Sequence, residues 1–184
     1  MKTTFNMALA ELGHVVEKVD ERAIEAACRA IDDAGRIVLY GCGREGLQLR
    51  GFAMRLYHLG FDVAMQGDMT APPVGPGDLF AVSDGPGRLS TVAALTGVAK
   101  KAGASVLLLT AEPQTGIAAK ADHLIAIPAQ TMARDQGAGA TSALPMGSVY
   151  EGALFLLFEM MVLQLRDLRG SEPEAMRARH TNLE

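Results

Sequence analysis

Apolar side chains three or four residues apart, the spacing of one face of an α-helix, mark most of the chain. This period predicts helices at residues 3–19, 21–34, 45–59, 89–102, 115–121 and 148–168. A shorter helix is predicted after Ser171, because an N-cap residue is followed by Pro173 near the first helical position. Between the helices, short runs are continuously apolar instead of periodic, at residues 36–42, 61–65, 78–83, 104–110 and 123–127.

Continuously apolar runs of this length are typical of strands that are buried on both faces of a parallel sheet. Five of them alternate with helices, so we expect an α/β fold: a three-layer αβα sandwich around a five-stranded parallel sheet, flavodoxin-like or Rossmann-like. Residues 129–147, rich in Gly, Ala and Ser, predict a long irregular segment. No repeat is visible, so residues 1–184 are expected to form a single domain with an N-terminal helical hairpin and a C-terminal helical tail.

The predicted helix at residues 148–168 has almost no polar face. A helix that is apolar all round is buried all round. Because it follows the strands and lies outside the predicted sandwich, we expect it to pack against another copy of the chain in a homo-oligomer. Its most apolar stretch, residues 152–165, contains Glu159 and is shorter than the roughly 20 residues that span a bilayer, so no membrane partner is expected.

Composition and charge exclude several classes of protein. The 184 residues include 17 basic and 21 acidic side chains, a formal net charge of −4, with no basic run, so a nucleic-acid partner is not expected. The charged N-terminal segment lacks the continuous apolar core of a signal peptide. Cys28 and Cys42 make neither a metal-binding spacing nor a disulfide framework. We therefore expect a cytoplasmic protein without a metal or another cofactor.

Turns that follow three of the predicted strands are candidates for a ligand site, at residues 41–46, 83–91 and 110–115. In an open parallel sheet, ligands bind beyond the carboxyl ends of the strands. The first two turns are rich in glycine, and the backbone amides of a turn that leads into a helix favour an anion.

The first of these turns also fits a dinucleotide-binding fingerprint, because Gly41, Gly43 and Gly46 match G-x-G-x-x-G. That fingerprint needs an acidic residue at the end of the next strand, about 20 residues later, whereas Asp62 lies inside the predicted strand. Two similar turns on successive units favour a sugar-phosphate cradle. The remaining alternative is that these glycines only permit tight turns.

Four blocks of the chain resemble the sugar isomerase (SIS) domain family, and most closely its 6-phospho-3-hexuloisomerase branch. In chain order they are Gly41-x-Gly-Arg44, Phe52-Ala-Met-Arg-Leu-Tyr-His-Leu-Gly60, Pro145-Met-Gly-Ser-Val-Tyr-Glu151 and Arg179-His-Thr-Asn-Leu-Glu184. The resemblance covers nearly the whole chain and keeps the order of all four blocks. The resemblance implies a five-stranded parallel sheet with flanking helices, usually assembled as a tetramer with its sites at subunit interfaces.

The resemblance also implies a reaction: a carbonyl moves one carbon along an open-chain sugar through a cis-enediol(ate), without a metal. The family's base is a glutamate at the start of the penultimate helix, which here is Glu151, and the family's C-terminal histidine corresponds to His180. Arg44 is expected to hold a substrate oxygen or to pair with Asp68, which lies near the site. From the residues alone, Glu151 also fits a partner of the helix dipole, and His180 a solvated tail residue.

The chain departs from the family where a phosphate would bind. The family has Ser after the arginine of the first turn, where this chain has Glu45, and its second turn is Ser-Gly-Ser-Gly-Glu-Thr, where this chain has Ser83-Asp-Gly-Pro-Gly-Arg88. Two hydroxyl donors are lost, Glu45 and Asp84 add negative charge, and only Arg88 adds positive charge. Like charges about 4 Å apart near a surface cost a few kcal/mol.

Three functions therefore compete. The first is an isomerase of a sugar phosphate, with Arg88 as the phosphate ligand, and the second is an isomerase of a sugar with a neutral, carboxylated or sulfonated end, with Glu45 or Asp84 binding hydroxyls. The third, a non-catalytic module that senses a sugar, normally has a further domain, so an isomerase is favoured. The substrate-binding residues predicted in this way are Gly43, Arg44, Glu45, Asp68, Ser83, Asp84, Gly85 and Arg88.

Overall fold

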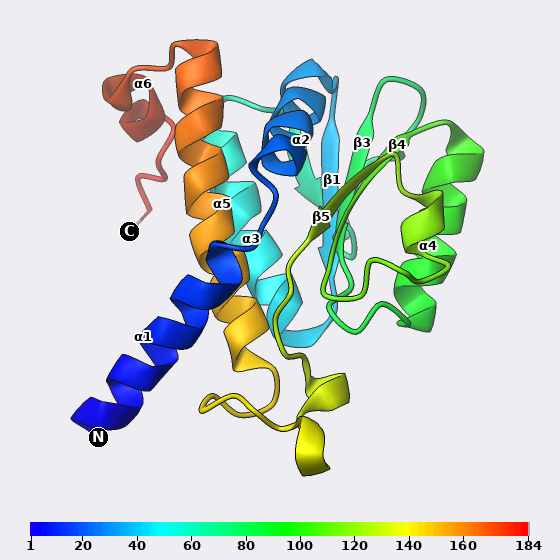
Figure 1. Ribbon diagram of the computed structural model, residues 1–184. Helices are drawn as coiled ribbons and strands as arrows, with labels where there is room; N and C mark the ends of the chain where they lie inside the picture. The colour runs from blue at the N-terminus through cyan, green and yellow to red at the C-terminus, as the bar shows by residue number, and fades with distance from the viewer. Residues whose placement is uncertain (184) are drawn as a thin grey trace.

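Five parallel strands form the sheet of the computed structural model, which describes residues 1–183 (Figure 1). The strands are β1 (Ile37–Gly41), β2 (Val63–Met65), β3 (Leu79–Ser83), β4 (Ser105–Thr110) and β5 (His123–Ala126). They are arranged in the order β2-β1-β3-β4-β5, and every neighbouring pair is parallel. The predicted α/β fold class is confirmed. Because the order reverses at β1 and β3, the carboxyl ends of these two strands mark the place where an open sheet binds its ligand.

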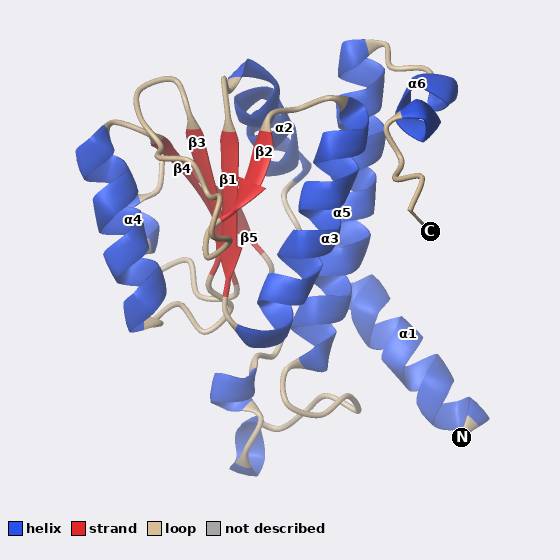
Figure 2. Ribbon diagram, turned by 180° about the vertical axis from the view of Figure 1, so that it is seen from behind, coloured by secondary structure: helices blue, strands red, loops and turns tan. Residues whose placement is uncertain are grey.

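Helices cover both faces of the sheet (Figure 2). The helices α2 and α3 pack on one face and α4 on the other, while α5 packs on α3 and α2, and α1 packs on α5. Their bounds are α1 (Lys2–Val16), α2 (Glu21–Asp33), α3 (Gly43–Leu59), α4 (Ser90–Ala102), α5 (Ser148–Arg169) and α6 (Pro173–Ala178). As predicted, residues 129–147 form an irregular segment, which contains only two short 3₁₀ turns.

The continuously apolar runs form strands because each strand contributes side chains to two cores. In β3 all five residues are buried. Leu79 and Ala81 pack in the core under α2, α3 and α5, whereas Phe80 and Val82 pack in the core under α4. Successive side chains of a strand point to opposite faces, so a strand covered on both sides needs apolar residues at every position.

Two local predictions need correction. The helix predicted at residues 115–121 is only a 3₁₀ turn over Ala118–Lys120, because Pro113 and Gly116 interrupt the short connection between β4 and β5. The last helix begins at Pro173, as expected, but its N-cap residue is Glu172 and not Ser171.

The apolar character of the long helix α5 has a cause within the chain, which the prediction from the sequence did not include. One side packs within its own chain, with Leu154, Met161 and Leu165 fully buried, while Phe155 and Met160, which flank that side to the left and right, are about half exposed. The helix is long and apolar enough to cross a bilayer by length and composition, contrary to the prediction from residues 152–165. Half of its most apolar window is nevertheless buried in the fold, as in a core helix of a water-soluble protein.

Candidate functional site

A cleft with a volume of about 310 Å³ lies beyond the carboxyl ends of β1 and β3. The turn after β1, the turn after β3, the irregular segment and the first turn of α5 form its walls. The lining residues are Cys42, Gly43, Arg44, Glu45, Pro86, Leu89, Thr131, Met132, Met146, Gly147, Tyr150 and Glu151. Three of the predicted substrate-binding residues and the predicted base thus share one cleft.

The turn from β1 into α3 is made by a close approach of two glycines. A Cβ on Gly46 would overlap the carbonyl oxygen of Gly41 and lie 3.2 Å from its carbonyl carbon, and Gly43 has a φ of 56°. The G-x-G-x-x-G pattern therefore has a steric cause. Because α3 begins at Gly43, the next two side chains, Arg44 and Glu45, project from the first helical turn beside the cleft.

The acidic residue considered for a dinucleotide site, Asp62, lies at the amino end of the strands, opposite to the glycine turn. Asp62 precedes β2, its backbone carbonyl accepts a hydrogen bond from the amide of Ile37 at the start of β1, and its carboxylate accepts a 2.9 Å hydrogen bond from Arg36 Nε. The glycine turn follows the other end of β1. Asp62 is therefore not placed to bind a ribose held by that turn.

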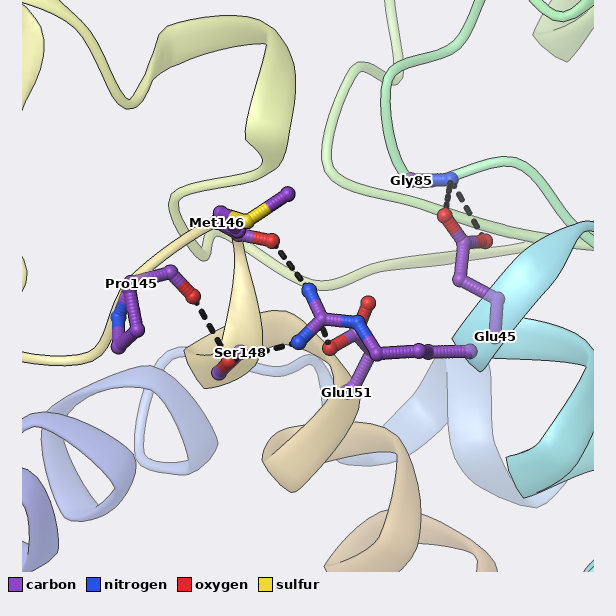
Figure 3. Close-up of polar contacts among 7 residues, drawn as sticks. Glu45, Gly85, Pro145, Met146, Ser148 and Glu151 are labelled. Atoms are coloured by element: carbon purple, nitrogen blue, oxygen red, sulfur yellow. Dashed lines mark hydrogen bonds and ion pairs between the residues drawn. The ribbon is translucent and has the colours of Figure 1, made fainter.

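Arg44 and Glu151 form an ion pair at the cleft, with Arg44 Nη2 lying 3.0 Å from Glu151 Oε2. The same guanidinium donates to Ser148 Oγ at 3.0 Å and to the carbonyl oxygen of Met146. Figure 3 shows Ser148 and Glu151 on the first turn of α5, next to Met146. Burial raises the pKa of the Glu151 carboxyl, and the nearby Arg44 charge acts in the opposite direction. This pair joins the start of α3 to the start of α5.

The second carboxyl of the cleft, that of Glu45, is turned towards the end of β3. It accepts a 2.5 Å hydrogen bond from Ser83 Oγ and a 3.0 Å hydrogen bond from the amide of Gly85, as Figure 3 shows for the amide. Ser83 Oγ also lies 3.1 Å from the hydroxyl of Tyr150. Burial raises the pKa of the Glu45 carboxyl, although the bonds from Ser83 and Gly85 oppose this shift. Ser83 and Gly85 therefore face this carboxyl.

Asp84 is fully buried but faces its own turn. Its Oδ2 accepts a 3.1 Å hydrogen bond from the amide of Leu89, just before α4, and the amides of Gly87 and Arg88 also stabilise the carboxylate. Burial nevertheless raises the pKa of Asp84. The residue is absent from the cleft lining, and its observed contacts stabilise the turn after β3; that Asp84 binds a substrate hydroxyl stays a prediction.

Three other predicted residues, Arg88, Asp68 and His180, do not line the cleft. Arg88 is exposed and does not line it. The expected pair of Arg44 with Asp68 is wrong: Asp68 Oδ1 lies 3.2 Å from Arg50 Nη1 instead. His180 stacks at a tilt against His58, with ring centroids 5.2 Å apart.

His180 cannot meet Glu151 within one chain in this arrangement. His58 lies 14 residues after Arg44 on the same helix, which corresponds to roughly 20 Å at 1.5 Å per residue. The tail is held there by Arg179, whose Nη1 donates a 3.0 Å hydrogen bond to the carbonyl of His58. Glu184, the last residue of the C-terminal block, lies outside the described residues.

The structure adds cleft residues to which the sequence assigned no role. Tyr150 lines the cleft, is buried and is bonded to Ser83, whereas Ser148 lies outside the lining and binds Arg44; both belong to the block that ends at Glu151, which was the available signal. Thr131 lines the cleft, is 4% exposed, and its hydroxyl has no hydrogen-bond partner among residues 1–183. No motif marks Thr131, because it comes from the irregular segment. Within the same described range, no group of three His, Cys, Asp or Glu residues is close enough to hold a metal ion.

Comparisons with known proteins identify relatives of the chain. The family model described as the SIS domain matches residues 30–156. A protein of Mycobacterium gastri named 3-hexulose-6-phosphate isomerase is 38% identical over 183 residues, which are 98% of this chain and 91% of that protein. A protein of the same name from Bacillus subtilis is 33% identical over the full length of both chains. A solved structure from Methanococcus jannaschii, whose description infers the same activity, is 23% identical with a TM-score of 0.84 over 98% of each chain, which shows a common fold.

Proposed function

The chain belongs to the SIS domain family, and from this premise we propose that it is an isomerase that moves the carbonyl of an open-chain hexulose by one carbon. The relatives named 3-hexulose-6-phosphate isomerase support this reaction type. The observation that carries the proposal is the partly buried carboxylate of Glu151 beside the guanidinium of Arg44 in the cleft.

In the reaction we propose, Glu151 removes the proton from the carbon next to the carbonyl. The electrons of that C–H bond form a C=C bond, and the carbonyl becomes an enolate oxygen, which gives a cis-enediolate. Glu151 then returns the proton to the former carbonyl carbon, while the hydroxyl on the other carbon becomes the new carbonyl after its proton moves to the first oxygen. A carboxyl whose pKa is raised by burial suits this exchange better than a fully solvated one.

Arg44 has the geometry to stabilise the intermediate. Its guanidinium lies within hydrogen-bond distance of Glu151, so an enediolate oxygen next to the base also lies near this positive charge. A fixed cation replaces the metal ion that some reactions of this kind use, and the mechanism we propose is metal-independent on that ground. The reaction is an intramolecular oxidation and reduction, an aldose–ketose or ketose–ketose isomerisation.

A homo-oligomer, a dimer or a tetramer, completes the proposal. Exposed apolar side chains on α1, α3 and α5 support an interface with further copies; they include Phe5, Leu9, Met54, Tyr57, Phe155, Met160 and Leu163. We propose that His180 acts in the cleft of a neighbouring copy, where it assists proton transfer between the two oxygens. Both cysteines are free, in keeping with the reducing cytoplasm, where we place the activity.

The test is the exchange of substrate hydrogen with D2O, followed by NMR for D-fructose and D-fructose 6-phosphate. The wild type should incorporate deuterium next to the carbonyl. Glu151→Gln should lower that rate by about 10²- to 10⁴-fold, the contribution of a general base. Glu159→Gln is the matched control, because Glu159 lies on the same helix and pairs with Arg55 at 3.2 Å, but does not line the cleft. Undiminished exchange by Glu151→Gln, or an equal loss in the control, would contradict the proposal.

Mixed oligomers test the role of His180. Glu151→Gln and His180→Ala should each be inactive alone, and co-expression should restore exchange, because one cleft of a mixed oligomer then contains both native groups. Sedimentation of the wild type should show a dimer or larger species. A monomer at micromolar concentration, or co-expressed variants that stay inactive, would refute the action of His180 in trans.

A further inference from the structure

In the proposed isomerase, the carboxyl group of Glu45 lies at the carboxyl end of β3, where the end of the sugar remote from the reacting carbons would bind. Resting on that proposed function, we propose that Glu45 determines the substrate class: its carboxyl fills the anion-binding part of the cleft, so that the chain isomerises a sugar that presents a hydroxyl, and not a phosphate, to the end of β3.

The contacts of Glu45 are those that an anionic ligand would need. A phosphate oxygen binds backbone amides and hydroxyls at a strand-to-helix turn. Here the amide of Gly85 and the hydroxyl of Ser83 both donate hydrogen bonds to Glu45 Oε2, at 3.0 and 2.5 Å. Glu45 as a residue is buried, with an exposed fraction of 9%. An incoming phosphate would have to displace a side chain that already satisfies these donors.

Gly85 and Glu45 depend on each other. A Cβ on Gly85 would lie 2.8 Å from Glu45 Oε1 and 3.0 Å from Tyr150 Cε1, so no larger residue fits while Glu45 holds this position. Two residues later, Gly87 has a φ of 70°, and a Cβ there would lie 2.6 Å from the Cβ of Glu112. Both glycines belong to the turn after β3, but only Gly85 contacts the Glu45 carboxyl, whereas Gly87 fits against the residues that follow β4.

The charges that line the cleft also oppose a phosphate. Glu45 and Glu151 are its two carboxylates, and Arg44, on the first turn of α3, is already paired with Glu151 of α5. Arg88 does not line the cleft. A dianion would therefore meet like charges in a partly buried site, where their repulsion is less screened than in bulk water.

A neutral polyhydroxylated ligand finds complementary groups in the same place. Among residues 1–183, Glu45 Oε1 accepts one long hydrogen bond, of 3.3 Å, from the amide of Gly85, and a carboxylate oxygen has lone pairs for a further donor. The hydroxyl of Thr131, buried in the cleft wall and without a partner among the described residues, can bind a second sugar hydroxyl. The volume of about 310 Å³ is that of a small-molecule site.

The experiment compares D-fructose with D-fructose 6-phosphate, both in the D2O exchange assay and as calorimetric ligands. The wild type should favour the unphosphorylated sugar by at least about tenfold. Glu45→Ser combined with Gly85→Ser opens the site and restores hydroxyl donors, so it should shift this ratio by at least about tenfold towards the phosphate ester. Glu45→Gln keeps the size of the side chain and removes its charge, and it should strengthen binding of inorganic phosphate. Glu17→Ser, which removes an exposed carboxylate just after α1, is the control and should change neither the sugar preference nor the binding of phosphate.

A wild type that prefers D-fructose 6-phosphate, or a ratio that the double variant leaves unchanged, overturns the inference while the proposed reaction stands. A wild type that exchanges neither sugar refutes the proposed function, and the inference is then decided by binding alone. Binding of inorganic phosphate only by the Glu45 variants supports the inference, whereas binding that is equal in the wild type and the variants overturns the inference. Should the double variant fail to fold, the comparison of the wild type with Glu45→Gln decides.

Discussion

Gly46→Ala should destabilise the protein, although alanine is normally the better helix former. Gly46 lies in the first turns of α3, against the end of β1. An added Cβ would overlap the carbonyl oxygen of Gly41 and approach its carbonyl carbon to 3.2 Å. Both atoms belong to the backbone, so no side-chain rotation relieves the overlap, and α3 must move away from the sheet.

The size of the effect follows from two opposing contributions. Overpacking costs about 1–3 kcal/mol, and contact with backbone atoms places this site at the upper end. Alanine gains about 1 kcal/mol over glycine inside a helix. We therefore expect a net loss of about 2 kcal/mol, which corresponds to a fall in Tm of roughly 4–8 °C for a domain of this size.

Gly51→Ala is the matched control, because it makes the same change in the same helix. Gly51 is exposed, and nothing lies within 4 Å of an added Cβ, so this variant should gain about 0.5–1 kcal/mol. Urea unfolding followed by circular dichroism measures both variants. Since the same turn holds Arg44 and Glu45, Gly46→Ala should also slow sugar exchange, and Gly51→Ala should not. A Gly46 variant as stable as the wild type, or a shift of the same sign in both, would refute the steric argument.

Other predictions concern the cleft. Arg44→Met removes the charge that opposes the raised pKa of Glu151, so this pKa should rise further. Because the base is then protonated at a higher pH, the acid limb of the rate–pH profile should move to higher pH. An unmoved limb would exclude this role of Arg44. Burial raises the thiol pKa of Cys28 to about 12, so iodoacetamide should modify the partly exposed Cys42 in the native protein and reach Cys28 only after unfolding, as mass spectrometry of digests would show. Because Cys42 lines the cleft, a bound hexulose should slow its labelling, and equal labelling with and without the sugar would place the ligand elsewhere.

The sheet and most helices were predictable because their signals are local. A strand between two helical layers requires an apolar residue at each position, as in β3, and a helix repeats its apolar residues every three or four positions. The helix predicted between β4 and β5 was wrong. The apolar spacing there favours a helix, but Pro113 and Gly116 disfavour one, and the short connection forms only a 3₁₀ turn. For α5, periodicity showed how apolar the helix is, but not which of its sides faces its own chain.

By itself, the sequence determined the fold class and the position of the glycine turns, since both depend on residue type and short-range spacing. Arg44 and Glu151 became candidates through the resemblance of their motifs to those of the SIS domain family. Only the tertiary structure decided which of these groups meet. Arg44 pairs with Glu151 across 107 positions of sequence instead of with Asp68, and Glu45 reaches Gly85 across 40. Such pairings depend on how α3, α5 and the sheet pack, and packing follows from the shapes of many side chains together. Packing also places two of the chain's carboxylates, those of Glu45 and Glu151, in the lining of the cleft.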